Sequence, residues 1–186
     1  QADPRWIVDD LGVTGTNVGR WHWQEQNVIE WTKRRVKELL ANLSYNLNDT
    51  ATLTIKSVSH VKGETSVANR KKKLIAFYQL DVSLVWEASW KPSDDAEAIK
   101  AKGKINLPYI SDENDMDDFE IQVTLDDSNT SKQQRELKDL AHKTIGSQIR
   151  PRIVTLLTEL KNGANVADKY KEWEKQERER EEREKL

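Results

Sequence analysis

The feature that most constrains this fold is a long alternation of apolar and polar side chains. The apolar ones occupy the even positions, namely Leu74, Ala76, Tyr78, Leu80, Val82, Leu84, Trp86, Ala88 and Trp90. The later odd positions are mostly polar, which predicts a strand with one buried and one solvated face. Each large buried side chain contributes about 1.5–3 kcal/mol. We therefore expect this strand to be the spine of the fold, with Trp86 and Trp90 in its core.

Three other stretches alternate in the same way and are predicted to be strands. They begin at Ala51, Ile99 and Phe119 and continue to about residues 61, 107 and 125. In the first of them the apolar phase slips between Ile55 and Val58, which indicates a β-bulge. The pair Lys62-Gly63 follows and is typical of a turn.

Two stretches have the helical period instead, residues 24–43 and 131–163. The second contains Pro151, which predicts a kink or a restart of the helix there. Asn162-Gly163 is expected to close it. The order helix, strands, helix with short connections predicts an α+β domain, in which an antiparallel meander sheet carries helices on one face.

The length of 186 residues suits one domain with some extra chain. Residues 1–20 are predicted to be a lead-in segment, and 21–163 the α+β domain. Residues 164–186 have a different character, with pairs of opposite charge at helical i,i+4 spacing, such as Glu174–Arg178. They contain no apolar stripe, so we expect a charged helical or disordered linker there rather than a coiled coil.

Composition excludes several classes of function. The chain has no cysteine, which excludes a disulfide scaffold, a thiolate metal site and a cysteine nucleophile, and fits a reducing compartment. No apolar run is long enough to predict a membrane span. The net charge is −2, although 33% of the residues are charged. Any electrostatic function is therefore expected in local clusters.

A search for catalytic or metal-binding motifs finds none. His22, His60 and His142 are not at metal-ligand spacing, and no phosphate- or dinucleotide-binding motif occurs. The acidic loop 111–118 has Met116 and Asp117 where a calcium loop needs an oxygen ligand and a glycine. The sequence predicts a binding module that has no cofactor, no metal and no catalytic residues.

One cluster that remains is a run of four cations, Arg70 to Lys73, with Glu64 upstream. On an extended segment, Arg70 and Lys72 would share one side, and Lys71 and Lys73 the other. The run precedes the buried part of the long strand, so we expect it to project from one end of the sheet. Two interpretations stay open: a partner-binding cluster, or a solubilising run that keeps a strand edge from pairing.

The other cluster is NVGRWHWQ, residues 17–24, just before the first predicted helix. If helical spacing already holds there, Trp21 and Trp23 cannot both face inward, and one would be an exposed aromatic anchor. Alternatively, both pack against the sheet and staple the start of the helix.

These clusters carry a family resemblance. TNVGRWHW, then GETSVANRKKKLIAFYQLDVSLVW, then LPYISDEN resemble the N-terminal domain of the activator of heat-shock protein 90 ATPase. The opening DPRWIV is similar to the animal-type members, and the resemblance extends from about Asp3 to Gly163. The fold of that family is an N-terminal helix, a four-stranded antiparallel meander sheet and a long C-terminal helix, which agrees with the order above.

The resemblance implies a cytoplasmic cochaperone without catalysis of its own. It would bind the middle segment of heat-shock protein 90, remodel the catalytic loop of that chaperone and favour its closed, ATP-hydrolysing dimer. The implied partner-binding residues are Arg70, Lys71, Lys73, Glu64, Asn17, Trp21, His22 and Trp23. Lys72 stands where the family's RKxK motif usually has glycine, and Gly19 and Arg20 replace two asparagines of its NxNNWHW motif.

A second hypothesis belongs to another class. The sheet could bind single-stranded nucleic acid through the same cations, with Phe77 and Trp23 stacking on bases. The net charge and the acidic loop argue against it.

Overall fold

The computed structural model describes residues 24–70, 73–164 and 183 of the chain. The predicted lead-in 1–20 and nearly all of the predicted linker 164–186 lie outside the described residues. The described part confirms an α+β fold. Its elements are β1 (Gln24–Asn27), α1 (Ile29–Leu40), β2 (Ser44–Asn46), β3 (Ala51–Arg70), β4 (Lys73–Trp90), β5 (Ile99–Ser111), β6 (Gln122–Leu125) and α2 (Lys132–Lys161).

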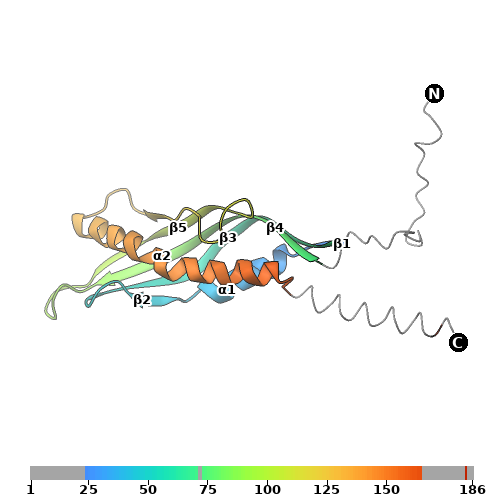
Figure 1. The fold of residues 1–186 in the computed structure, drawn as a ribbon. Helices are drawn as coiled ribbons and strands as arrows, with labels where there is room; N and C mark the ends of the chain where they lie inside the picture. Colours follow the sequence, from blue (N-terminus) through green and yellow to red (C-terminus); the bar gives the residue numbers. More distant parts are fainter. Residues whose placement is uncertain (1–23, 71–72, 165–182, 184–186) are drawn as a thin grey trace, which may run out of the picture.

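The sheet is built on the predicted four-stranded meander, in which β3, β4, β5 and β6 pair antiparallel in chain order. Two short strands extend it to six. Both pair with β3, β1 against residues 66–69 and β2 against residues 52–54. The two longest strands, β3 and β4, run the length of an elongated molecule (Figure 1).

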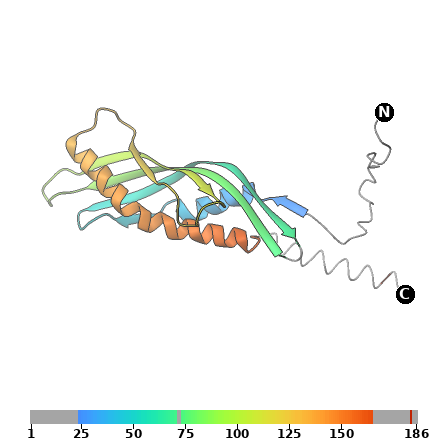
Figure 2. The same cartoon turned by 45° about the horizontal axis from the view of Figure 1, so that its top comes forward.

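Both helices lie on one face of the sheet, as predicted, and α2 crosses it obliquely (Figures 1 and 2). Trp86 is fully buried beneath them, and Trp90 packs at the margin of the same core. On β4 the burial follows the predicted alternation, so the odd-numbered side chains lie on the opposite face. We call that opposite face of the sheet the outer face.

The register of β3 confirms the predicted bulge and corrects the predicted turn. Register shifts occur between Ile55 and Ser57 and between Val58 and His60. Lys62-Gly63 is not a turn, because β3 continues through it and Gly63 pairs with Leu80. Gly63 has a φ of +117°, and a Cβ there would lie 2.0 Å from the carbonyl oxygen of Gln79. The glycine thus allows close backbone approach within a strand and does not reverse the chain as predicted.

The first helix is shorter than predicted at both ends. Residues 24–27, expected in the helix, form β1, because their pairing with β3 outweighs the helical period. The side chain of Asn27 then accepts a hydrogen bond of 2.9 Å from the backbone N–H of Ile29, where the helix begins. The helix ends at Leu40, and Asn42 has a left-handed backbone with a φ of +59°.

The second helix is continuous from Lys132 to Lys161 with Pro151 inside it, so the alternative of a restart at Pro151 is wrong. Ser131 and Gln134 form a reciprocal capping box at its start, which satisfies two backbone N–H groups. Asn162 and Gly163, with a φ of +89° at the glycine, end the helix as predicted.

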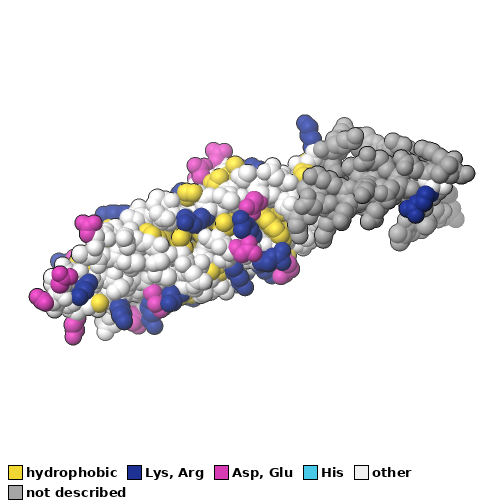
Figure 3. Space-filling model, turned by 90° about the horizontal axis from the view of Figure 1, so that it is seen from below, with side chains coloured by type: hydrophobic (Ala, Val, Ile, Leu, Met, Phe, Trp, Pro, Cys, Tyr) yellow, Lys and Arg dark blue, Asp and Glu magenta, His cyan; other side chains and the backbone are white. Residues whose placement is uncertain are grey.

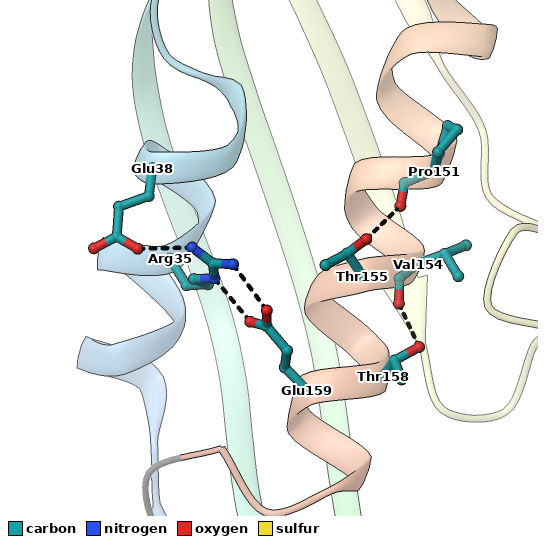
Figure 4. A network of polar contacts seen from close by, with 7 residues as sticks. All are labelled: Arg35, Glu38, Pro151, Val154, Thr155, Thr158 and Glu159. Carbon is teal, nitrogen blue, oxygen red and sulfur yellow. Dashed lines mark hydrogen bonds and ion pairs between the residues drawn. The ribbon is translucent and has the colours of Figure 1, made fainter.

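A bidentate ion pair joins the two helices (Figure 4). Arg35 of α1 donates from Nε and Nη2 to the two carboxylate oxygens of Glu159 of α2, at 2.7 and 2.8 Å. Its Nη1 donates to Glu38 at 2.9 Å. Hydrogen bonds to Glu159 and then to Glu38 raise the pKa of Arg35. This link fixes α1 relative to the long helix near the same end of the sheet as the β3–β4 hairpin.

Candidate functional site

The cationic run lies at the turn of the β3–β4 hairpin. Arg70 is the register partner of Lys73, so the chain reverses between them. The expectation that residues 70–73 form one extended segment, with alternate cations on opposite sides, is therefore wrong. The expected position at one end of the sheet is correct, and Figure 2 shows the hairpin extending beyond the helices. Lys71, Lys72 and the side chain of Arg70 lie outside what the structure describes.

Lys73 is the one cation of the run whose side chain is described. It is exposed, and it forms no ion pair within the described ranges. No carboxylate of the described residues neutralises its charge. The partner-binding role assigned to Arg70, Lys71 and Lys73 stays a prediction.

Glu64 shares the outer face with Lys73. It is exposed and lies opposite Gln79, and directly opposed residues of an antiparallel pair point to the same face. Gln79 and Lys73 are both odd-numbered positions of β4 and share that face as well. The following side chain on β3 points the other way, since the hydroxyl of Thr65 lies 3.0 Å from that of Thr32 in α1. Six residues of strand separate Glu64 from Arg70, or about 20 Å.

Two aromatic side chains on this face were not assigned to the cochaperone site from the sequence. Phe77 and Tyr109 are the exposed large hydrophobic residues of the described chain, at 43% and 42% exposure. Phe77 lies opposite Ser66, and Tyr109 lies in a bulge of β5 beside Asp81. An apolar residue at an odd position of the alternating strand is a signal that could have identified Phe77. Tyr109 has no such signal, because a bulge in β5 turns its side chain to this face. We call Glu64, Lys73, Phe77, Gln79 and Tyr109 the hairpin surface.

The remaining predicted site residues, Asn17, Trp21, His22 and Trp23, lie outside the described residues. The described chain begins beside the hairpin, since Gln24 pairs with Asn69, the residue before the cationic run. Gln24, the last residue of the second cluster, therefore lies beside the strand that leads into the cationic run.

The described surface carries charges of both signs. Figure 3 shows Lys and Arg side chains interleaved with Asp and Glu on the face that it draws. On the outer face, His60 Nε2 lies 3.0 Å from the Asp81 carboxylate. No group of three or more metal-ligating side chains lies together in the described ranges. Neither described helix has the length and apolar composition that a membrane crossing requires.

The chain is similar in sequence to known proteins. A family model described as "Activator of Hsp90 ATPase, N-terminal" matches residues 25–164. The chain is 36% identical over 164 residues to mouse activator of 90 kDa heat shock protein ATPase homolog 2, covering 87% of this chain and 46% of the relative. It is 29% identical to the Hsp90 co-chaperone HCH1 of Saccharomyces cerevisiae, covering 54% of this chain and 69% of that protein. The chain thus spans about half the length of the first of these relatives.

Among solved structures, the solution structure of the human Aha1 N-terminal domain superposes with a TM-score of 0.54 and 28% sequence identity. The match covers 75% of this chain and 97% of that domain.

Proposed function

This chain belongs to the family described as Activator of Hsp90 ATPase, N-terminal, and on that premise we propose that it is a cochaperone that binds Hsp90 and stimulates its ATPase. The relatives named above are described as activators of the 90 kDa heat shock protein ATPase and as an Hsp90 co-chaperone. The proposal includes a finer mechanism, in which the chain binds the middle segment of Hsp90, remodels its catalytic loop and favours the closed dimer.

The observation that carries this mechanism is the position of the cationic run at the turn of the longest hairpin. A turn at the end of two long strands can reach a partner's surface before the body of the sheet does. Well-formed hydrogen bonds to charged groups contribute about 1.5–3 kcal/mol each, whereas exposed ion pairs contribute about 0–1 kcal/mol. Three or four such contacts give moderate affinity that falls as salt is added.

In this mechanism, some residues at this end of the sheet provide affinity and others provide activation. Phe77 and Tyr109 supply apolar area of the kind that anchors interfaces, and Glu64 supplies a charge about 20 Å from the tip. Arg70, Lys71 and Lys73 act at the catalytic loop. Asn17, Trp21, His22 and Trp23 add to the same end of the molecule, with Gly19 and Arg20 altering their contribution.

Activation requires more than affinity. A ligand that binds two states of its partner equally well shifts neither population. The chain must therefore bind the hydrolysis-competent state of Hsp90 more tightly than the resting state. The proposal places this difference in the cationic turn, because that is the part of the chain that would contact the catalytic loop.

The experiment that tests the proposal measures the ATPase rate of Hsp90 with and without this chain. A saturable rise in rate supports it, and an unchanged rate at concentrations where binding is complete contradicts it. A gel-shift titration with single-stranded oligonucleotides tests the nucleic-acid hypothesis. The exposure of Phe77 is compatible with that hypothesis too, because an exposed ring can stack on a base. Tight oligonucleotide binding without ATPase stimulation would favour that hypothesis instead.

A further inference from the structure

A hollow of about 540 Å³ lies on the outer face at the end of the sheet remote from the hairpin. Strands β3, β4 and β5 form its floor. One rim is formed by Asp127 and Thr130, from the segment between β6 and α2, and by Gln134 in the first turn of α2. Lys73 and Glu87 are separated by fourteen residues of β4, or about 45 Å of extended chain. The hollow is therefore distinct from the hairpin surface.

Lysines of one strand dominate this region. Lys100, Lys102 and Lys104 are exposed, occupy alternate positions of β5 and therefore point to the same face. We call them the lysine row. None of the three forms an ion pair with any described residue. Glu87 is the register partner of Lys102 but lies 3.8 Å from Lys56, on the other side. The lining of the hollow and the lysine row together contain four lysines, the fourth being Lys56, and two acidic residues, Glu87 and Asp127, so an excess of positive charge remains.

Protection of a strand edge does not explain the lysine row. Where β6 ends, the backbone carbonyls of β5 already have partners: Gln134 Nε2 donates to Lys100 O at 3.0 Å, and the N–H of Asp126 donates to Lys102 O at 3.1 Å. The edge is thus covered without help from the lysine side chains, and β4 occupies the other edge. The row is better explained by attraction to a ligand of opposite charge.

The spacing and surroundings of the row indicate what that ligand is. Alternate residues of a strand repeat at about 6.6 Å, and the alternate side chains of an extended peptide have the same repeat. Carboxylates at every second position of such a peptide can therefore face Lys100, Lys102 and Lys104 in turn. Single-stranded nucleic acid would need aromatic stacking partners. The exposed aromatic residues of the described chain, Phe77 and Tyr109, belong to the hairpin surface.

We propose that the hollow and the lysine row form a second binding site, which takes an acidic peptide segment in extended conformation. Ser89 lines the hollow beside the row and offers its hydroxyl group to the backbone of that segment. The hydroxyls of Thr52 and Thr54, which also line it, already bond to Asn46 and Ser44. The site is independent of the cationic turn, so the chain would hold an acidic segment at one end while the hairpin surface engages a folded partner at the other.

The test uses fluorescence anisotropy at low ionic strength with a labelled peptide that alternates Glu and Ser, and with its Gln-for-Glu counterpart. We expect the acidic peptide alone to bind. The triple variant Lys100→Gln, Lys102→Gln, Lys104→Gln should weaken binding at least about tenfold, since three charge contacts are lost. A matched control, Lys138→Gln, Lys143→Gln, Lys161→Gln, makes the same change in net charge on α2 and should retain wild-type affinity.

Three results overturn the proposal: no binding of the acidic peptide to wild type, equal loss in the two triple variants, or tighter binding of an oligonucleotide that depends on the same lysines. Amide chemical shifts of the wild-type chain provide a readout that needs no variant. They should move in residues 100–104 and stay in place at Lys73. A Lys73→Gln variant should still bind the peptide, so that failure of this site and failure of the cochaperone proposal are told apart.

Discussion

Phe77 is the residue whose exposure most needs an explanation, because it is an aromatic side chain on the solvated side of an otherwise well-patterned strand. We predict that Phe77→Ala weakens binding to Hsp90 about tenfold, as expected for an interface anchor. Its neighbour on the same face provides the control, since Gln79→Ala should change affinity less than about twofold. Isothermal titration calorimetry measures both. Wild-type affinity in Phe77→Ala would contradict the proposal that Phe77 anchors the interface.

Gly63 is the residue on which the β3–β4 pairing depends most. A methyl group there would meet the Gln79 carbonyl at 2.0 Å and would require a positive φ of an alanine. We predict that Gly63→Ala lowers the free energy of unfolding by at least about 2 kcal/mol. Gly146→Ala, in α2, is the matched control. Its Cβ would have ordinary contacts with the side chains of Arg150 at 3.7 Å and Ile121 at 3.9 Å, and it should stabilise by about 0.5–1 kcal/mol. Urea titrations that show equal effects would contradict this account.

Tyr45 is expected to make the stability of the fold depend on pH in the alkaline range. Its hydroxyl is buried, and burial raises the pKa of Tyr45 to about 12 against a smaller opposing effect of the nearby Thr144 side chain. The fold favours the neutral phenol, so its contribution is complete below the unfolded pKa of about 10 and is lost as pH rises toward 12. Unfolding measured from pH 9 to 12 should show this decline, and Tyr45→Phe should reduce it. An unchanged decline in that variant would assign it to other groups.

At the scale of elements, the link between α1 and α2 depends on Arg35 and Glu159. We predict that Arg35→Ala costs about 1–2 kcal/mol of stability, because a bidentate, partly buried pair is lost. Lys33→Ala removes a more exposed pair with Glu30 at 2.8 Å and should cost less than about 0.5 kcal/mol. Arg35→Lys should recover only part of the loss, since an ammonium cannot donate in bidentate fashion. Thermal unfolding of the three variants tests the ranking, and equal losses would refute it.

The elements that the sequence predicts well are those in which one physical signal dominates. The alternation on β4 indicates the strand, its buried face and the burial of Trp86, and few other folds are compatible with it. Asn162-Gly163 likewise marks the end of α2 through its backbone conformation. These signals are local, so a single sequence contains them.

The elements that it predicts poorly depend on partners distant in the sequence. Gly63 has the composition of a turn, yet its pairing with Leu80 keeps it in a strand and moves the true turn into the cationic run. Residues 24–27 have a helical period, but they pair with β3. The candidate site is also difficult to predict from local patterns. Tyr109 lies on the outer face because of a bulge, and no local sequence pattern predicts that bulge.

At the scale of the whole molecule, the long sheet separates the two proposed binding sites along its length. Helices cover one face (Figure 1), and the outer face presents the hairpin surface at one end and the lysine row at the other. Charges at both ends make each contact sensitive to salt, although the net charge of the chain is only −2. The fold therefore acts as a rigid support that holds local clusters of charge apart.

The most direct test of the central claim compares stimulation with binding for one variant, Lys71→Ala. We measure the Hsp90 ATPase rate at saturating chain and, separately, the dissociation constant, with Lys143→Ala on α2 as control. The account predicts that Lys71→Ala loses most of the stimulation while its affinity falls only severalfold, and that the control behaves as wild type. Wild-type stimulation by Lys71→Ala would contradict the claim that the cationic turn acts on the ATPase of Hsp90.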